Sequence, residues 1–176
     1  MRHQVSCLFT LALVLVLSGA SAFAASEDNP AQPTAHSEHP EQDLRVIDGD
    51  TLKIDGTTYR MWGIDAPEKG QQCERNEGEY YDCGAHSSLA LKTIIGKNKV
   101  TCEKVNTDRY KRLVARCYLG GTMDLGSWMV NAGYAVEYKR YSKGYYQTEQ
   151  DNAEEAQRGL WAGDFTMPWD YRKERR

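Results

Sequence analysis

The segment "LRVIDGDTLKIDGTTYRMWGI", residues 44–64, contains the clearest signals of the fold. Short runs of alternating apolar and polar residues follow one another along it, and the Asp-Gly pairs at residues 48–49 and 55–56 interrupt them. Alternation is typical of half-buried β-strands, and Asp-Gly favours a tight hairpin turn because both residues tolerate a positive φ. The stretch therefore predicts three short strands in an up-and-down meander.

Helical and extended patterns alternate downstream of this meander. A helix is expected to begin near Gly84 and to end at Gly96, and Asp124 is a suitable N-cap for a second helix. This second helix is expected at residues 124–132, a third helix at 148–158 with a short extended piece before it, and two further strands at 99–105 and 113–119. Five strands with a helix between the third and the fourth predict an α+β fold, a five-stranded OB-fold barrel with three helices.

The residues before the meander are predicted to be an export signal followed by a linker. Residues 1–24 combine a charged start, an apolar run and small residues, which is typical of a cleaved signal peptide. The apolar run is short for a membrane span, so we expect no membrane attachment after cleavage. Residues 25–43 are polar and are predicted to be a disordered linker. The folded domain is expected at residues 44–176, in a periplasmic or secreted monomer.

The charge of this domain differs from that of the whole chain. Of 22 Lys plus Arg and 25 Asp plus Glu, one basic and five acidic residues precede Leu44, which leaves 21 against 20 and a net charge of +1. A nearly neutral domain has no general electrostatic attraction for nucleic acid. Any such binding must come from local clusters of basic residues.

Four cysteines remain after removal of the signal peptide, Cys73, Cys83, Cys102 and Cys117. An even number in an exported chain favours two disulfides, and four cysteines allow three pairings. We expect Cys102 to pair with Cys117, because they are placed symmetrically about a hairpin centre, and Cys73 to pair with Cys83 across a polar insertion. The alternative, a zinc site, lacks a close Cys-x-x-Cys pair.

Two segments place carboxylates at strand ends: "DGD", residues 48–50, and "GIDAPE", residues 63–68. Asp48 precedes Gly49 and is best explained by the turn, whereas Asp50 and Asp65 offer the hard oxygen ligands that Ca²⁺ or Mg²⁺ requires. We expect the two connections to lie at opposite ends of the meander. They can share a site only if Asp50 lies inside the second strand and the third strand bends back.

Basic residues occur close to these carboxylates and in a later loop. Arg60 lies on the strand that leads into "GIDAPE", and Arg109, Lys111 and Arg112 belong to "TDRYKRL", residues 107–113. Taken alone, each is explained by solvent exposure. Two guanidinium groups that converge on carboxylates and a metal would suit phosphodiester cleavage, because Arg binds phosphate through two bonds and keeps its charge.

Together these segments resemble the thermonuclease family, also called the staphylococcal nuclease-like family. The motifs occur in order and at compatible spacing over about residues 44–161, and they are "VIDGDTLKI", "YRMWGIDAPE", "TDRYKRLVA", "MVNAGYAVEY" and "AEEAQRGLW". The resemblance implies an OB-fold barrel with three helices. It also implies a Ca²⁺-dependent phosphodiesterase that cuts DNA and RNA and leaves 3′-phosphate ends.

The resemblance also implies roles for individual residues. Asp50 and Asp65 correspond to the calcium-binding carboxylates and Ala66 to a ligand through its backbone carbonyl. Glu68 corresponds to the general base that activates water. The two phosphate-binding arginines are Arg60 and Arg112.

Substrate contacts are implied in two places. Lys111 replaces a Gly that is common in the family before Arg112, and it makes the loop more basic. Tyr141, and less closely Tyr138, correspond to the segment that packs on a nucleotide base, which predicts stacking that tolerates any sequence. We expect DNA, RNA or both as partners, single-stranded or frayed. The acidic insertion between Cys73 and Cys83 departs from the family pattern and would repel a phosphate backbone.

Two other functions remain open. One is a noncatalytic OB-fold module that binds nucleic acid or another partner, since this fold can lose its chemistry and still bind. The other is a domain in which Ca²⁺ is only structural, which explains the carboxylates but not the paired arginines.

Overall fold

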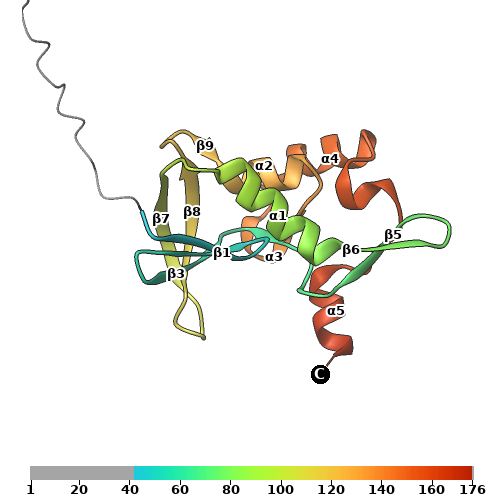
Figure 1. The fold of residues 1–176 in the computed structure, drawn as a ribbon, viewed down its shortest axis with the longest axis horizontal. Coiled ribbons are helices and arrows are strands. Elements are labelled where there is room, and N and C mark those ends of the chain that lie inside the picture. Colours follow the sequence, from blue (N-terminus) through green and yellow to red (C-terminus); the bar gives the residue numbers. More distant parts are fainter. Residues whose placement is uncertain (1–41, 176) are drawn as a thin grey trace, which may run out of the picture. The chain divides into compact units, whose positions relative to one another are not determined.

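The computed structural model describes residues 42–175, shown in Figure 1. The predictions for residues 1–24 and for most of the linker lie outside these residues. The strands are β1 Leu44–Asp48, β2 Thr51–Ile54, β3 Thr57–Met61, β4 Ile64–Asp65, β5 Gln72–Asn76, β6 Glu79–Asp82, β7 Val100–Thr107, β8 Leu113–Leu119, β9 Met123–Asp124 and β10 Val136–Glu137. The helices are α1 Cys83–Ile95, α2 Leu125–Asn131, α3 Lys139–Ser142, α4 Gln147–Glu155, the 3₁₀ helix η1 Gly159–Ala162 and α5 Pro168–Glu174.

The main sheet has the strand order β1-β2-β3-β8-β7, with the short β9 on β8. β3 and β8 run parallel, and the other neighbours run antiparallel. This order confirms the predicted α+β fold of the OB type. Within residues 42–175 no backbone ladder joins β1 to β7. Instead, the side-chain amide of Gln42 donates to the carbonyl of Val100 at 2.9 Å and accepts from its N–H at 3.0 Å, which links the two edges.

The meander brings both carboxylate segments to the same end of the sheet, contrary to the expectation. β2 and β3 pair antiparallel, with Thr51 opposite Arg60, so the end of β3 lies beside the β1–β2 turn. The N–H of Met61 donates to the carbonyl of Asp50 at 2.7 Å. Asp50 lies in the turn before β2 and not inside that strand. The chain reverses direction twice between β1 and β3. These reversals bring the two segments together without a bend in β3.

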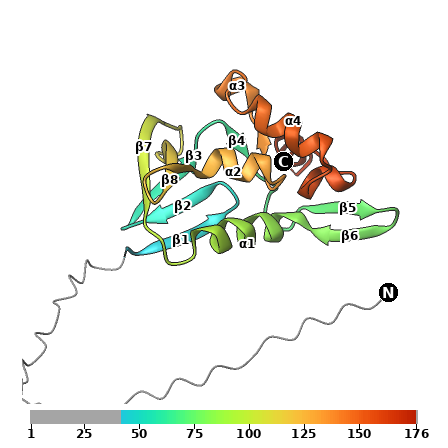
Figure 2. The same ribbon diagram turned by 90° about the horizontal axis from the view of Figure 1, so that it is seen from above.

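Three helices form where they were predicted: α1 packs against β1, α2 packs against β8, and α4 packs on α2 (Figure 2). Leu52 of β2, Leu91 of α1, and Leu125 and Met129 of α2 are fully buried. Each such side chain contributes about 1.5–3 kcal/mol on burial. Asp124 caps α2 as predicted, because its carboxylate accepts the N–H of Gly126 at 2.8 Å.

The last predicted helix, α4, ends at Glu155, three residues earlier than expected. Gln157 adopts a left-handed conformation with φ 49°, and the N–H of Arg158 donates to the carbonyl of Ala153 at 2.9 Å. This is a Schellman ending, here without glycine at the left-handed position. Gly159, expected as the stop, begins η1 instead.

Both disulfides have the predicted partners. Cys102 and Cys117 lie directly opposite each other on β7 and β8, with their Cα atoms 4.1 Å apart. Cys73 on β5 pairs with Cys83 at the start of α1. The second bridge therefore closes the polar insertion, which folds as the β5–β6 hairpin.

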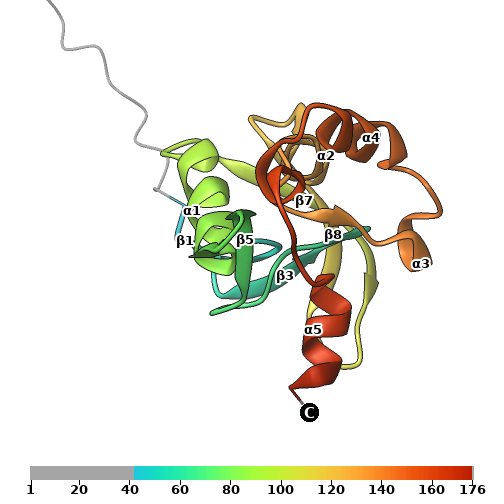
Figure 3. The ribbon, with the colours of Figure 1, turned by 90° about the vertical axis from the view of Figure 1, so that its right-hand side faces the viewer.

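Several short elements had not been predicted: β4, which pairs with β10, the β5–β6 hairpin, β9, and the helices α3, η1 and α5. β10 lies where a short extended piece was expected. Figure 3 shows α5 and the β7–β8 loop extending on the same side of the sheet. In the part of the chain that the structure describes, no helix has the length and apolar character needed to cross a membrane.

Candidate active site

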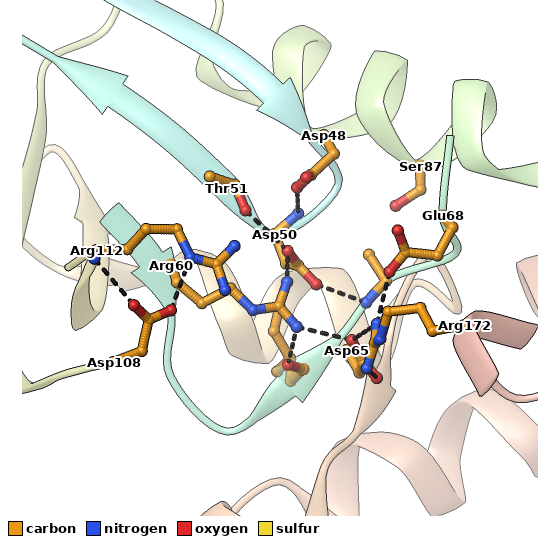
Figure 4. Close-up of polar contacts among 12 residues, drawn as sticks. Asp48, Asp50, Thr51, Arg60, Asp65, Glu68, Ser87, Asp108, Arg112 and Arg172 are labelled. Carbon is orange, nitrogen blue, oxygen red and sulfur yellow. Dashed lines mark hydrogen bonds and ion pairs between the residues drawn. The ribbon is translucent and has the colours of Figure 1, made fainter. Parts of the chain in front are cut away.

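Two buried carboxylates form the centre of the site (Figure 4). Asp50 is 2% exposed and Asp65, on β4, is fully buried. Asp50 Oδ2 accepts the N–H of Ala66 at 2.8 Å, and its Oδ1 accepts the hydroxyl of Thr51 at 3.1 Å. Asp48 serves the turn as predicted, since its Oδ1 accepts the N–H of Asp50 at 3.0 Å. These bonds hold the β1–β2 turn against the segment that follows β3.

Arg60 bridges the two carboxylates. Its Nη2 donates to Asp65 Oδ1 at 2.7 Å, and its Nη1 forms an ion pair with Asp50 Oδ1. Burial lowers the pKa of the Arg60 guanidinium, and the neighbouring Asp65 opposes this shift. Because one planar group touches both carboxylates, Asp50 and Asp65 lie within reach of a single cation.

Glu68 lies at the edge of this pair, with its side chain 37% exposed. Its N–H donates to Gln71 Oε1 at 3.0 Å, and its carbonyl accepts the N–H of Gln71 at 2.9 Å. The start of α1 packs directly on the same carbonyl: a Cβ at Gly84 would come within 1.9 Å of the oxygen. The backbone of Glu68 is therefore fixed from two sides. Glu68 also lines a cleft between α5 and the β7–β8 loop.

Arg172, on α5, is the residue of the site that sequence analysis missed. Its Nη1 lies 2.8 Å from Asp65 Oδ1 and 2.6 Å from Glu68 Oε1, and its Nη2 lies 2.6 Å from Asp65 Oδ2. The hydrogen bond to Asp65 raises the pKa of the Arg172 guanidinium; burial opposes this, and Glu68 adds to it. α5 follows the last motif in the sequence, and the only available signal was the spacing of Trp169, Arg172 and Lys173 on one helical face.

Arg112 stands apart from the carboxylates, at the base of the β7–β8 loop. Its Nε donates to Asp108 Oδ2 at 2.7 Å, and its backbone N–H donates to Asp108 Oδ1 at 2.9 Å. Burial of Asp108 raises its pKa, but the hydrogen bonds from Arg112 outweigh that effect and lower it. The Asp108 carboxylate thus orients a guanidinium that still has free donors for a ligand.

Lys111 has a left-handed backbone with φ 65°. This conformation explains why Gly suits the position, because only Gly adopts it without strain. Lys111 is exposed, and the described residues that line the cleft include its neighbours Tyr110 and Arg112 but not Lys111 itself.

Aromatic side chains stand beside the carboxylates. Tyr138 stacks on Trp169 of α5, with ring centroids 5.3 Å apart and an angle of 15° between the planes. Tyr141 meets the edge of Tyr138 at 5.1 Å and is 54% exposed. One face of the Tyr138 ring is therefore covered, whereas Tyr141 keeps most of its surface open.

These groups surround one cleft of about 800 Å³. It lies between α5 and the β7–β8 loop, and its lining includes Arg60, Glu68, Arg112, Tyr138, Tyr141 and Arg172. The cleft combines carboxylates, guanidinium groups and aromatic rings, so it suits a ligand that carries both phosphate and a flat base.

The carboxylates of Asp50 and Asp65 fit a hard cation, because carboxylate oxygens are the ligands that Ca²⁺ prefers. Within residues 42–175 no group of three or more His, Cys, Asp and Glu side chains is arranged to hold a metal ion. Protein ligands would therefore come from Asp50 and Asp65, with the other positions taken by a backbone carbonyl and water.

Comparisons with known proteins identify the family to which the chain is similar. Residues 58–163 match the family model described as "Staphylococcal nuclease homologue". A succinoglycan biosynthesis protein of Rhizobium meliloti is 36% identical over 117 residues, which cover 66% of this chain and 61% of that protein. An uncharacterized endonuclease of Escherichia coli is 32% identical over 135 residues, 73% of this chain and 82% of that protein. A probable staphylococcal-like nuclease of Oryza sativa is 34% identical over 119 residues, 66% of this chain and 22% of that protein.

Proposed function

Because the chain belongs to the staphylococcal nuclease homologue family and is thus a nuclease, we propose that it hydrolyses phosphodiester bonds of DNA, RNA or both with the help of Ca²⁺. One observation carries the proposal: two buried carboxylates share the guanidinium of Arg60, and Arg60 and Arg112 line the same cleft. A module that only binds nucleic acid would not need buried carboxylates, since charge on them repels the phosphate backbone.

Asp50 and Asp65 would hold the calcium ion, with the backbone carbonyl of Ala66 as a further ligand. When bound, the ion would polarise the scissile phosphate and orient the attacking water. The burial of both carboxylates favours such a cation, because charges attract each other more strongly away from bulk water.

Glu68 would take the proton from the attacking water. Its fixed backbone and partly exposed carboxylate suit a general base that must meet water and substrate together. Arg60 and Arg112 would bind the phosphate oxygens and stabilise the negative charge that grows as water attacks phosphorus. The bond between phosphorus and the 5′ oxygen breaks. One product then ends in a 3′-phosphate and the other begins with a 5′-hydroxyl.

Tyr141 would stack on a base, because its ring is the more exposed of the two tyrosines. Tyr138 would support it from the edge, and Lys111 would add positive charge at the rim of the loop. Flat, sequence-tolerant stacking favours single-stranded or frayed substrates. The signal-like start and the two disulfides support export to an oxidising compartment, periplasmic or extracellular, and a monomer suffices for the site.

The ends of the products test the reaction. Incubation of the full chain with a single-stranded oligonucleotide and Ca²⁺ is expected to yield fragments with 3′-phosphate ends, identified by mass spectrometry before and after phosphatase treatment. Fragments with 5′-phosphate ends would contradict the proposed direction of cleavage. Intact oligonucleotide that stays bound to the chain would favour the noncatalytic alternative.

A further inference from the structure

Arg172 occupies the carboxylates that the proposed mechanism assigns to calcium and to water. Both oxygens of Asp65 accept bonds from it, at 2.8 and 2.6 Å, and Glu68 Oε1 accepts a third at 2.6 Å. Asp65 is fully buried, so bulk water does not supply alternative partners. A cation that takes Asp65 as a ligand competes with Arg172 for the same two oxygens.

We propose that Arg172 is an internal counter-ion that competes with the metal ion for Asp65 and Glu68, so that metal binding releases α5 from the site. This inference rests on the calcium dependence proposed above. Arg172 acts by positioning the carboxylates and has no part in the chemistry. The metal-free chain is then a closed state in which the general base is neutralised by an ion pair.

Charge balance supports competition. Asp50, Asp65 and Glu68 meet the two guanidinium groups of Arg60 and Arg172, which leaves one negative charge uncompensated. In the metal-free chain, Arg172 supplies positive charge to these carboxylates. A dication at Asp50 and Asp65 would supply that charge in its place. Arg172 and a metal ion would repel each other at the same buried carboxylate. Arg172 is the one that can leave, because its side chain is partly exposed and lies on α5.

The attachment of α5 makes its release possible. Only Pro168 of this seven-residue helix is buried. Apart from Arg172, its contacts include the stack of Trp169 on Tyr138, the packing of Trp169 against the buried cluster of Cys73, Cys83, Val136 and Leu160, and a bond of 3.3 Å from the hydroxyl of Tyr171 to the carbonyl of Gly70. Figure 3 shows α5 projecting away from the sheet and the other helices, so its movement disturbs few of the elements that the structure describes.

Calcium affinity tests the competition. Isothermal titration of the full chain with Ca²⁺ is expected to show at least tenfold tighter binding by Arg172→Gln than by the parent. Arg172→Lys should lie between them, because Lys keeps the charge but not the planar fork. The matched control is Arg175→Gln, which removes the same charge from the end of the same helix, where Arg175 contacts Tyr171 and not the carboxylates. Its affinity should stay within twofold of the parent.

Hydrogen exchange supplies a second readout. Amides of residues 169–174 are expected to exchange faster when Ca²⁺ is added to the parent chain, and already faster without Ca²⁺ in Arg172→Gln. Equal or weaker calcium binding by Arg172→Gln would overturn the competition while leaving the calcium-dependent nuclease intact. Absence of binding by every variant would overturn both the competition and the calcium assignment, and cleavage assays would then report on the nuclease alone.

Discussion

Arg112→Ala is expected to lower the rate of cleavage of single-stranded DNA by about a thousandfold, the cost of removing a donor that stabilises transition-state charge. The guanidinium of Arg112 faces the cleft and is held by Asp108, so it is already oriented before a ligand arrives. Its side chain is 33% exposed, and its ion pair with Asp108 contributes little to stability. The melting temperature should therefore stay close to that of the parent.

The control for Arg112 is Arg109→Ala in the same loop. Arg109 donates to the hydroxyl of Tyr110, and this bond is exposed to solvent. Arg109→Ala therefore removes the same charge as Arg112→Ala but breaks no bond to Asp108. We expect less than a tenfold loss of rate. Cleavage by Arg112→Ala at the rate of the parent would show that the residue has no part in catalysis.

Arg60→Ala is expected to lose both activity and stability. Unlike Arg112, Arg60 is the shared partner of two buried carboxylates, and its removal leaves two charges without that partner. Breaking a buried ion pair on one side costs about 3–5 kcal/mol of unfolding free energy. Urea denaturation without metal measures this loss. Arg60→Lys, which keeps the charge but not the bidentate geometry, should recover part of the stability and little of the activity.

Calcium should also stabilise Arg60→Ala more than it stabilises the parent. The ion supplies positive charge to Asp50 and Asp65 that the variant lacks, and a ligand bound to the folded state adds to its stability. The shift in melting temperature on addition of Ca²⁺ measures this difference. Equal stability of the variant and the parent in the absence of metal would mean that Arg60 is not the counter-ion of these carboxylates.

Local signals in the sequence were sufficient for much of the fold. Alternation and Asp-Gly turns predicted β1 to β3, Gly96 predicted the end of α1, and Asp124 predicted the cap of α2. These features depend on neighbours within a few residues. The cysteine pairs followed from symmetry and from the small number of possible pairings.

Interactions between distant segments were harder to predict. Arg172 lies 107 residues from Asp65, on a seven-residue helix in which only Pro168 is buried, so its partners could not be read from the sequence. The location of Asp50 was also misjudged, since the turn before β2 and the end of β3 meet at one end of the sheet. In both cases the site depends on pairing across the fold and not on local pattern.

We propose that the carboxylate pair binds calcium for phosphodiester cleavage. The measurement that tests this is the rate at which the full chain cuts a labelled single-stranded DNA in Ca²⁺ and in excess chelator. The parent should cut in Ca²⁺ and stop in chelator, and restored Ca²⁺ should restore the rate. Asp65→Asn should stay inactive at calcium concentrations that saturate the parent. Cleavage by the parent that continues at an unchanged rate in chelator, or Asp65→Asn that cuts as fast as the parent, would contradict the account.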